Sequence, residues 1–294
     1  MEWVILSATG RLARVELPES PWHVRARQGP ARADHDVIAA TAPVTDGYVG
    51  VVASTGNAYR LAASDLPDLI PGGPWSLWDC PNAAHTIGLA APATVVGLYS
   101  LDPEAGPLAI GTAAGVVKRV VPEYKGWETW EVMGVKPDDA IVGVAHAADA
   151  DDLVFITGDA QLLRLSAREV RPQGRPAGGM VGIKLTGDGA VIYFTAVSKA
   201  DREQAVVVTL AQGPDSAASV KVTAFEEYPA KGRSTTGVRT HRFLKGQDRV
   251  GLAWVGIPPV RACDSTGAPR NLPAASDRRD GTGAKVYGPF YAFG

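Results

Sequence analysis

A hairpin-like unit recurs along the chain, and this repeat constrains the fold more than any other feature. Each unit has an apolar strand, a tight turn and a second strand with a basic residue. Four clear copies span residues 4–15, 51–61, 109–120 and 154–165, and two weaker copies span 206–222 and 251–272. The basic positions recur every 45 to 59 residues, which is the length of a four-stranded propeller blade: Arg14, Arg60, Arg119, Arg164, Lys221 and Arg270. The repeat predicts an all-β, six-bladed architecture.

Turn chemistry supports this interpretation. Gly10, Gly56 and Gly115 stand where a tight reversal needs positive φ. The strands before these turns are almost entirely apolar, as expected for strands that are buried on both faces. No long polar linker divides the chain, so we expect residues 1–294 to form a single domain.

Composition excludes several classes of protein. With 294 residues and 46% hydrophobic side chains, the chain can bury a core without metal or disulfide support. Cys80 and Cys263 form no framework, which fits a reducing cytoplasm. No apolar run approaches the roughly 20 residues of a membrane span, and the first six residues are typical of a strand rather than a signal peptide. We therefore expect a cytoplasmic protein.

The sequence offers no catalytic residue, metal site or cofactor site. The acidic stretch 149–152 lacks the spacing and glycine of a calcium loop and predicts a polar turn. His23 and His35 have no partnering pattern of metal ligands. The glycines at 178–179 precede no Gly-Lys-Ser/Thr of a phosphate loop. The seven tryptophans are expected to pack between blades.

One segment resembles a known family. Residues 161–185, which contain Glu169-Val170-Arg171-Pro172 and later Gly182-Ile183, resemble a signature segment of the C-terminal domain of DNA gyrase A. That family shows a basic strand followed by E-V-R-P-M-G-R-x-A-x-G-V-x-G-I-x-L. Residues 48–68, 111–119 and 228–238 are similar to other blades of the same domain. The chain is therefore similar to the C-terminal domain of the A subunit of a bacterial type IIA topoisomerase.

The resemblance implies a six-bladed β-pinwheel, a propeller-like disc of four-stranded antiparallel blades with swapped strand order. It also implies that duplex DNA bends around the rim without sequence specificity. The protein partners it implies are the catalytic N-terminal part of the A subunit, and through that part the ATPase B subunit. The chain shows no counterpart of the catalytic breakage-reunion region, and we expect an isolated domain or a remnant of such a subunit.

A departure from the family pattern bears on the kind of topoisomerase. Gyrases carry a box of the form Q-R-R-G-G-K-G after the first hairpin, whereas residues 25–32 read RARQGPAR. Such a degraded box favours a topoisomerase IV A-like subunit that supports ATP-dependent strand passage, with gyrase-type wrapping for negative supercoiling as the alternative. A propeller that serves as a protein-interaction platform is an alternative of another class. A propeller enzyme would need carboxylates or histidines that converge on the central channel.

Basic side chains on outer hairpins are the expected phosphate contacts. The net charge of −2 is unusual for a nucleic-acid binder, and it predicts one basic arc on an otherwise acidic disc. For the repeated arginines, a role in bridging adjacent blades and a role in DNA contact are equally open. The predicted DNA-binding residues are Arg25, Arg27, Arg32, Lys118, Arg119, Lys125, Arg168, Arg171, Arg175, Lys184, Lys231, Arg233, Arg239, Arg242 and Lys245.

Overall fold

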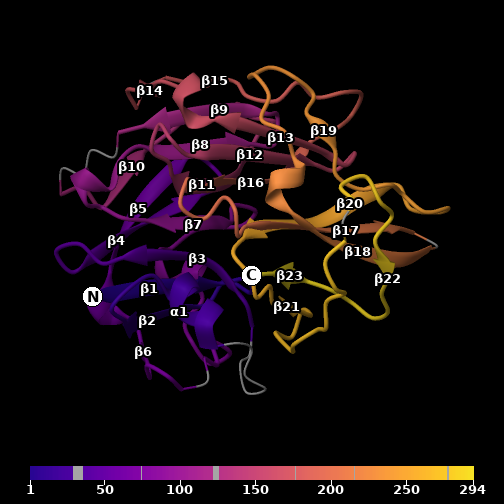
Figure 1. Cartoon of the computed structure of the whole chain (residues 1–294). Helices are drawn as coiled ribbons and strands as arrows, with labels where there is room; N and C mark the ends of the chain where they lie inside the picture. Colours follow the sequence, from indigo (N-terminus) through magenta and orange to yellow (C-terminus); the bar gives the residue numbers. More distant parts are fainter. Residues whose placement is uncertain (29–35, 74, 122–125, 176, 215, 277) are drawn as a thin grey trace.

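Small β-sheets surround a central axis in the computed structural model, which describes residues 1–28, 36–73, 75–121, 126–175, 177–214, 216–276 and 278–294 (Figure 1). The first sheet has the order β3 (Ile38–Pro43), β1 (Glu2–Ser7), β2 (Leu12–Glu16) and β6 (Asp68–Leu69). The second has the order β10 (Thr129–Glu131), β5 (Asn57–Ala62), β4 (Tyr48–Ala53) and β7 (Val95–Tyr99). Each sheet is one blade of a propeller-like ring.

The next three blades repeat this arrangement. The third has the order β11 (Ile141–His146), β8 (Leu108–Thr112), β9 (Val116–Val120) and β14 (Pro172–Gln173), with β15 (Met180–Val181) also paired to β9. The fourth has the order β16 (Val191–Val197), β12 (Asp152–Thr157), β13 (Gln161–Ser166) and β19 (Val238–Arg239). The fifth has the order β20 (Arg249–Gly256), β17 (Val206–Gly213), β18 (Ser216–Ala224) and β22 (Ala284–Lys285).

Short elements connect the blades and close the ring. A two-stranded sheet pairs β21 (Ala262–Cys263) with β23 (Ala292–Phe293). The helices are α1 (Pro21–Gln28) and α2 (Ala83–Thr86), and the 3₁₀ turns are η1 (Ala63–Asp65), η2 (Pro103–Ala105), η3 (Ala167–Glu169) and η4 (Phe225–Glu227). These elements occupy the connections between strands and leave the sheets to form the core.

The predicted all-β, propeller-like fold is confirmed, with a difference in the last unit. Residues 251–255 do not start a sixth hairpin, because they lie in β20 and pair with β17 of the fifth blade. Pro258 and Pro259 follow β20 and cannot donate to a sheet. The described part of the chain therefore holds five full blades and the two-stranded sheet. Pairing is antiparallel apart from β6 with β2, β14 with β9 and short bridges such as Arg164 with Ala230.

Strand order is exchanged between neighbouring blades, as in a pinwheel. The strand β6 follows β5 of the second blade but pairs with β2 of the first. In the same way β10 follows β9 of the third blade but pairs with β5 of the second. The chain thus returns after each hairpin to complete the preceding blade, and adjacent blades are interleaved.

The hydrophobic core lies between neighbouring blades. Phe155 and Phe194 of the fourth blade have ring centroids 4.7 Å apart and pack with Ala109 and Val117 of the third. Gly143 of β11 permits this approach, since a Cβ there would lie 2.0 Å from the Phe194 carbonyl oxygen. Close packing between blades therefore depends on glycine in the inner strand.

The C-terminal sheet closes the ring between the fifth and first blades. The Asp36 backbone N–H, just before β3, donates to the Gly267 carbonyl at 2.7 Å. The Cys263 thiol lies 3.7 Å from the Asp36 carboxylate. On the same side Trp22 of α1 and Trp254 of β20 have ring centroids 6.3 Å apart. These contacts join the two ends of the blade series (Figure 1).

Three of the repeated arginines, Arg14, Arg119 and Arg164, hold the exchanged strands in place. Arg119 is buried and donates to the carbonyls of Ala147, Ala167 and Val170 at 2.8 to 3.2 Å, and it pairs with Asp149 at 2.8 Å. Ala167 and Val170 follow the hairpin of the next blade. Of the two roles left open by the sequence, Arg119 therefore has the structural one, which is to bridge adjacent blades.

Two other repeated arginines make equivalent bridges. Arg164 pairs with Asp152 at 2.7 Å, donates to the Tyr228 carbonyl at 3.1 Å and lies 4.5 Å from the Phe225 ring centre. Arg14 pairs with Asp68 of the exchanged strand β6 at 2.8 Å and with Glu2 at 3.0 Å. Each guanidinium reaches the segment that returns from the next blade.

Lys221 and Arg270 are not equivalent to these arginines. The first hairpin strand of each of these blades has a β-bulge in its pairing with the inner strand, and its last residue before the bulge serves as a reference point. The residues opposite Arg14, Arg119 and Arg164 lie two positions before this reference residue. The residue opposite Lys221 is Thr209, which lies one position before it. This makes Lys221 equivalent to Lys118, which faces Ile110. Arg270 lies outside the strands and pairs with Asp264 at 3.0 Å.

Replacing Arg119 is expected to destabilise the fold. An Arg119→Met substitution keeps the apolar stem but leaves three buried carbonyls without this donor, which should lower the free energy of unfolding by about 3 kcal/mol. Urea unfolding measures the effect. The matched control is Arg168→Ala, an exposed arginine that should change stability by less than about 0.5 kcal/mol. Equal stabilities of the two variants would contradict the bridging role.

Candidate nucleic-acid interface

Two basic segments that are far apart in sequence lie side by side at the outer edge of the third and fourth blades. The Ser234 N–H donates to the Gly182 carbonyl at 2.7 Å, and the Lys184 N–H donates to the Thr235 carbonyl at 2.9 Å. Figure 1 shows β14, β15 and β19 at this edge. We call the combined area the basic rim surface, and its members are Arg168, Arg171, Arg175, Lys184, Lys231, Arg233 and Arg239.

Backbone geometry fixes the second segment against the fourth blade. Gly237 has φ +80°, and a Cβ there would lie 2.2 Å from the Leu162 carbonyl oxygen. Glycine is therefore required for the loop to pair with β13. The Arg233 guanidinium donates to the Val181 carbonyl at 2.8 Å and ties the two segments together. The loops are thus held by hydrogen bonds on a rigid sheet edge.

Positive charge is concentrated on this surface. Residues 167–184 and 229–239 contain seven Lys or Arg and one acidic residue, Glu169, which gives a net charge of +6. Since the whole chain has a net charge of −2, the remainder carries −8. The Glu169 carboxylate accepts the Arg233 backbone N–H at 2.9 Å. The near-neutral total therefore hides a strongly one-sided distribution.

Most members of the basic rim surface are open to solvent. Arg168, Arg171, Lys184, Lys231 and Arg239 are exposed, whereas Arg175 and Arg233 are half-buried. The Arg175 guanidinium lies 4.3 Å from the ring centre of Trp127, which is itself 39% exposed. The sequence interpretation missed Trp127 because it treated every tryptophan as a packing residue.

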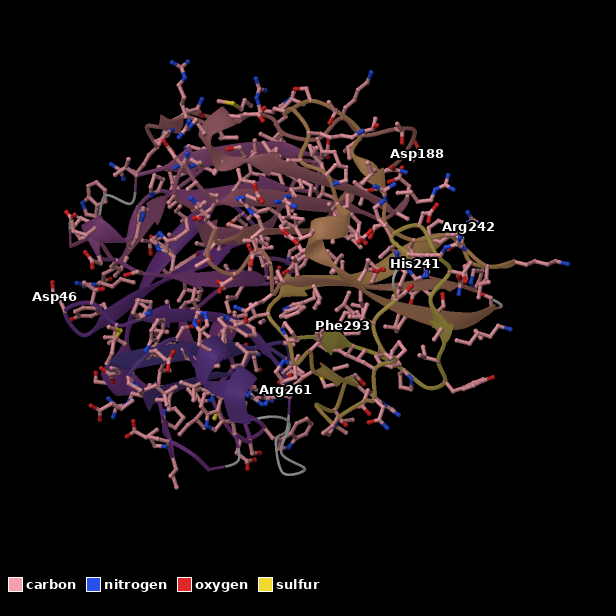
Figure 2. All side chains as sticks on the ribbon, in the orientation of Figure 1. Asp46, Asp188, His241, Arg242, Arg261 and Phe293 are labelled. Carbon is pink, nitrogen blue, oxygen red and sulfur yellow. The ribbon has the colours of Figure 1, made fainter. Side chains whose placement is uncertain are left out.

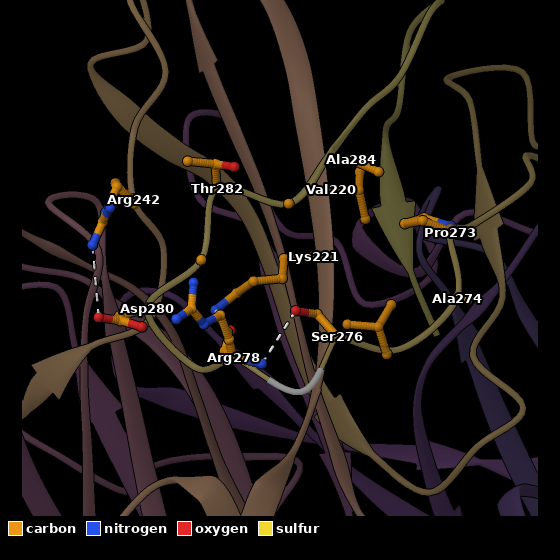
Figure 3. A pocket seen from close by; sticks show the side chains of 13 residues that line it. Val220, Lys221, Arg242, Pro273, Ala274, Ser276, Arg278, Asp280, Thr282 and Ala284 are labelled. Atoms are coloured by element: carbon orange, nitrogen blue, oxygen red, sulfur yellow. Dashed lines mark hydrogen bonds and ion pairs between the residues drawn. The ribbon is translucent and has the colours of Figure 1, made fainter.

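Arg242 and Lys245 are also exposed but lie further along the edge, between the fourth and fifth blades. Figure 2 shows Arg242 beside His241 at this edge. The Arg242 guanidinium is 3.9 Å from the Asp280 carboxylate, next to a pocket of about 480 Å³ (Figure 3). Arg278 lines the same pocket and was not predicted, although the adjacent pair Arg278-Arg279 is visible in the sequence.

Burial removes three predicted residues from the interface. Lys118 is fully buried and donates to the carbonyls of Val132 and Arg175 at 2.8 and 2.7 Å. Burial lowers the pKa of its ammonium group to about 8. Arg119 bridges blades as described above, and Arg25 is buried with its guanidinium 4.9 Å from the Trp75 ring centre. The side chains of Arg27, Arg32 and Lys125 lie outside the described residues.

The acidic stretch 149–152 is structural. Asp149 and Asp152 pair with Arg119 and Arg164, and the Asp151 carboxylate accepts the N–H groups of Ala148 and Lys199. Within the described ranges, no group of His, Cys, Asp and Glu side chains is arranged to hold a metal ion. In the same ranges, no helix is long and apolar enough to cross a membrane.

A buried histidine supports the edge beneath Arg242. The His241 Nε2–H donates to the Thr282 carbonyl at 2.9 Å, and Nδ1 accepts from the Thr209 hydroxyl at 2.9 Å. Ser219 lies 3.1 Å from Nε2. Burial lowers the pKa of His241 to about 4, so the ring is neutral at pH 7. The network joins β17, β18 and the loop that carries Arg278.

Comparison with known proteins finds relatives among DNA gyrase and topoisomerase subunits. The family model for the DNA gyrase C-terminal domain, beta-propeller, matches residues 151–198 and 216–253. The chain is 31% identical over 153 residues to the DNA gyrase A subunit of Deinococcus deserti and 33% identical over 135 residues to the topoisomerase subunit TopoM of Mycolicibacterium smegmatis. These matches cover 50% and 46% of this chain and 18% of each relative, so the chain spans less than a fifth of their length.

Solved structures share the fold across the whole chain. The crystal structure of the C-terminal domain of DNA topoisomerase IV has a TM-score of 0.73 at 18% identity and covers 100% of this chain and 92% of its own. The structure of the DNA gyrase A C-terminal domain has a TM-score of 0.66 at 15% identity, and the match covers 99% of this chain and 98% of that domain. The chain is thus a propeller-like disc with exchanged outer strands. The predicted resemblance to the C-terminal domains of the gyrase and topoisomerase IV A subunits is confirmed by the family model, the relatives and the shared fold.

His241 predicts a pH dependence of stability. Its folded pKa of about 4 is below the ordinary value of 6.5, so the unfolded state binds more protons between these values. The free energy of unfolding should therefore fall as the pH drops below 6.5, by about 2 kcal/mol from this group at pH 5. Urea unfolding at pH 7 and pH 5 measures the fall.

The comparison uses two variants. His241→Gln should show a smaller fall between pH 7 and pH 5 than the unsubstituted protein. His85→Gln, which replaces an exposed histidine, should leave the fall unchanged. An unchanged pH dependence in His241→Gln would show that the ring is not held neutral in the folded protein.

Proposed function

We propose that this chain is a DNA-binding disc that contacts duplex DNA without sequence specificity. The phosphates would lie along the basic rim surface. The observation that carries the proposal is the gathering of +6 charge in two hydrogen-bonded loops on a chain whose remainder carries −8. A duplex carries about one negative charge per 1.7 Å of its axis, so a surface of clustered, exposed guanidinium and ammonium groups suits it.

The arrangement suits phosphate contact rather than base readout. The basic side chains come from short strands and loops at a sheet edge, and no described helix projects from that edge to enter a groove. Bending a duplex costs on the order of 1–6 kcal/mol, so several contacts along an arc must act together. Arg242 and Lys245 would extend the path from the fourth blade toward the fifth.

The degraded box supports a topoisomerase IV A-like role over a gyrase role. Arg25 occupies the first position of the segment that matches the box, and it is buried against Trp75. This position therefore offers no phosphate contact. The disc would bend DNA for ATP-dependent strand passage without full wrapping. Its protein partners would be the ATPase B subunit, together with the catalytic part of the A subunit, at the nucleoid in the cytoplasm.

Charge removal on the basic rim surface should weaken DNA binding. The double substitution Arg168→Ala and Arg171→Ala removes two exposed charges. The slope of log affinity against log salt should become shallower by about 1.8, because each phosphate contact contributes about 0.9. Fluorescence anisotropy with a linear duplex across a salt series gives the slope.

The matched control removes two exposed lysines elsewhere. Lys136→Ala with Lys199→Ala causes the same change in net charge and should leave the salt slope almost unchanged. If both double variants change the salt slope equally, DNA binding depends on the overall net charge of the protein rather than on the basic rim surface. Absence of salt-dependent binding by the unsubstituted protein would favour the protein-interaction platform.

DNA topology separates the two topoisomerase roles. Ligation of a nicked plasmid in the presence of the protein, followed by deproteinisation, reports how much writhe the protein has constrained. We expect a small change in linking number, since the first box position is buried. A large, concentration-dependent change would contradict the topoisomerase IV-like role and support gyrase-type wrapping.

A further inference from the structure

The centre of the ring contains a second candidate site, independent of the rim. The inner strands β3, β7, β11, β16 and β20 neighbour one another around the axis. Two adjoining cavities of about 410 and 240 Å³ lie between them and share Ala40, Val144, Tyr193 and Trp254. Small residues such as Ala39, Ala145 and Ala196 leave this space unfilled.

One mouth of the channel combines aromatic rings with a carboxylate. Trp22 and Trp254 line the larger cavity with ring planes inclined at 52°. Tyr193 lines it as well, and its hydroxyl is fixed by the Val255 backbone at 3.2 and 3.4 Å. Asp201 lies at the same mouth, where its carboxylate accepts the Ser198 hydroxyl at 2.8 Å. Aromatic faces beside a carboxylate are the usual recognition elements for organic ammonium groups.

Electrostatics at this mouth favour a cation. Among the described residues that line the two cavities, Asp201 is the one carboxylate, and none is Lys or Arg. His146 donates from Nδ1 to the Gly106 carbonyl and accepts the Ser100 N–H at Nε2, and burial lowers its pKa, so it is neutral. The remaining base, His23, lies 3.2 Å from Asp201 with both side chains partly exposed. A partly exposed pair of this kind is weak, so an incoming ammonium group can replace His23 as the partner of the Asp201 carboxylate.

We propose that the channel mouth formed by Trp22, Tyr193, Trp254 and Asp201 binds a small organic cation, namely an alkylammonium compound with an apolar body. The ammonium group lies against the aromatic faces and pairs with the Asp201 carboxylate. The apolar body extends along the alanine-lined channel toward Phe293, which lines the second cavity and is labelled near the centre of the molecule in Figure 2.

The test compares two probes of the same shape. Choline carries the charge, and its neutral carbon isostere is 3,3-dimethylbutan-1-ol. Choline should bind in the millimolar range and shift the indole N–H signals of Trp22 and Trp254 in ¹H–¹⁵N spectra, whereas Trp127 at the rim should not shift. The isostere should bind at least about tenfold more weakly. Equal affinities, or no shift with choline, would overturn the proposal.

A matched pair of variants locates the charge. Asp201→Asn keeps an acceptor for Ser198 and should weaken choline binding at least about tenfold. Asp188→Asn makes the same charge change on an exposed outer turn and should leave binding unchanged (Figure 2). Equal effects would exclude the channel mouth as the site. Should Asp201→Asn fail to fold, the probe comparison on the unsubstituted protein decides the question alone.

Discussion

The exchange of outer strands depends on a buried guanidinium. Each returning segment must reverse direction at the outer edge of the preceding blade, where its carbonyls are shielded from water. Arg119 satisfies the carbonyls of Ala167 and Val170 at this point, and Arg164 satisfies that of Tyr228. Arginine suits the task because its rigid fork carries five donors and stays charged. Arginine recurs at the same register as Arg14, which reaches the returning strand β6 through the Asp68 carboxylate rather than through a carbonyl.

This internal use of arginine determines which charges are available outside. The guanidinium of Arg119 fixes η3, and the turn then directs Arg168 and Arg171 to solvent. Lys118 also has an internal role. Its ammonium group donates to the Arg175 carbonyl and so positions the loop that carries Arg175. One set of basic residues thus builds the rim, and another set, in the loops it supports, faces outward. A charge count over the whole sequence cannot separate the two sets.

The sequence predicted the repeat, the all-β fold, the two basic segments and the uneven charge, because these follow from local patterns. It did not predict that Lys118 and Arg119 are both buried. Neighbours in a strand face opposite sides, so one of them is normally exposed. Here the next blade covers one face, while β14, β15 and the Arg175 loop cover the outer edge. The end of the repeat was also missed, because β20 is as apolar as a first hairpin strand and only its pairing with β17 assigns it to the fifth blade.

Ring closure and the central space have a common origin in the small residues of the inner strands. Gly143 and Gly111 let the Phe194 side chain and backbone approach the third blade closely, which brings the blades together around the axis. Alanines that line the larger cavity, such as Ala39, Ala145 and Ala196, lack the side chains that would otherwise fill the centre. With a two-stranded sheet in place of a sixth blade, Trp22 and Trp254 meet across the closing point instead of being separated by a full sheet. The reduction of the last repeat is therefore what brings aromatic side chains to the channel mouth.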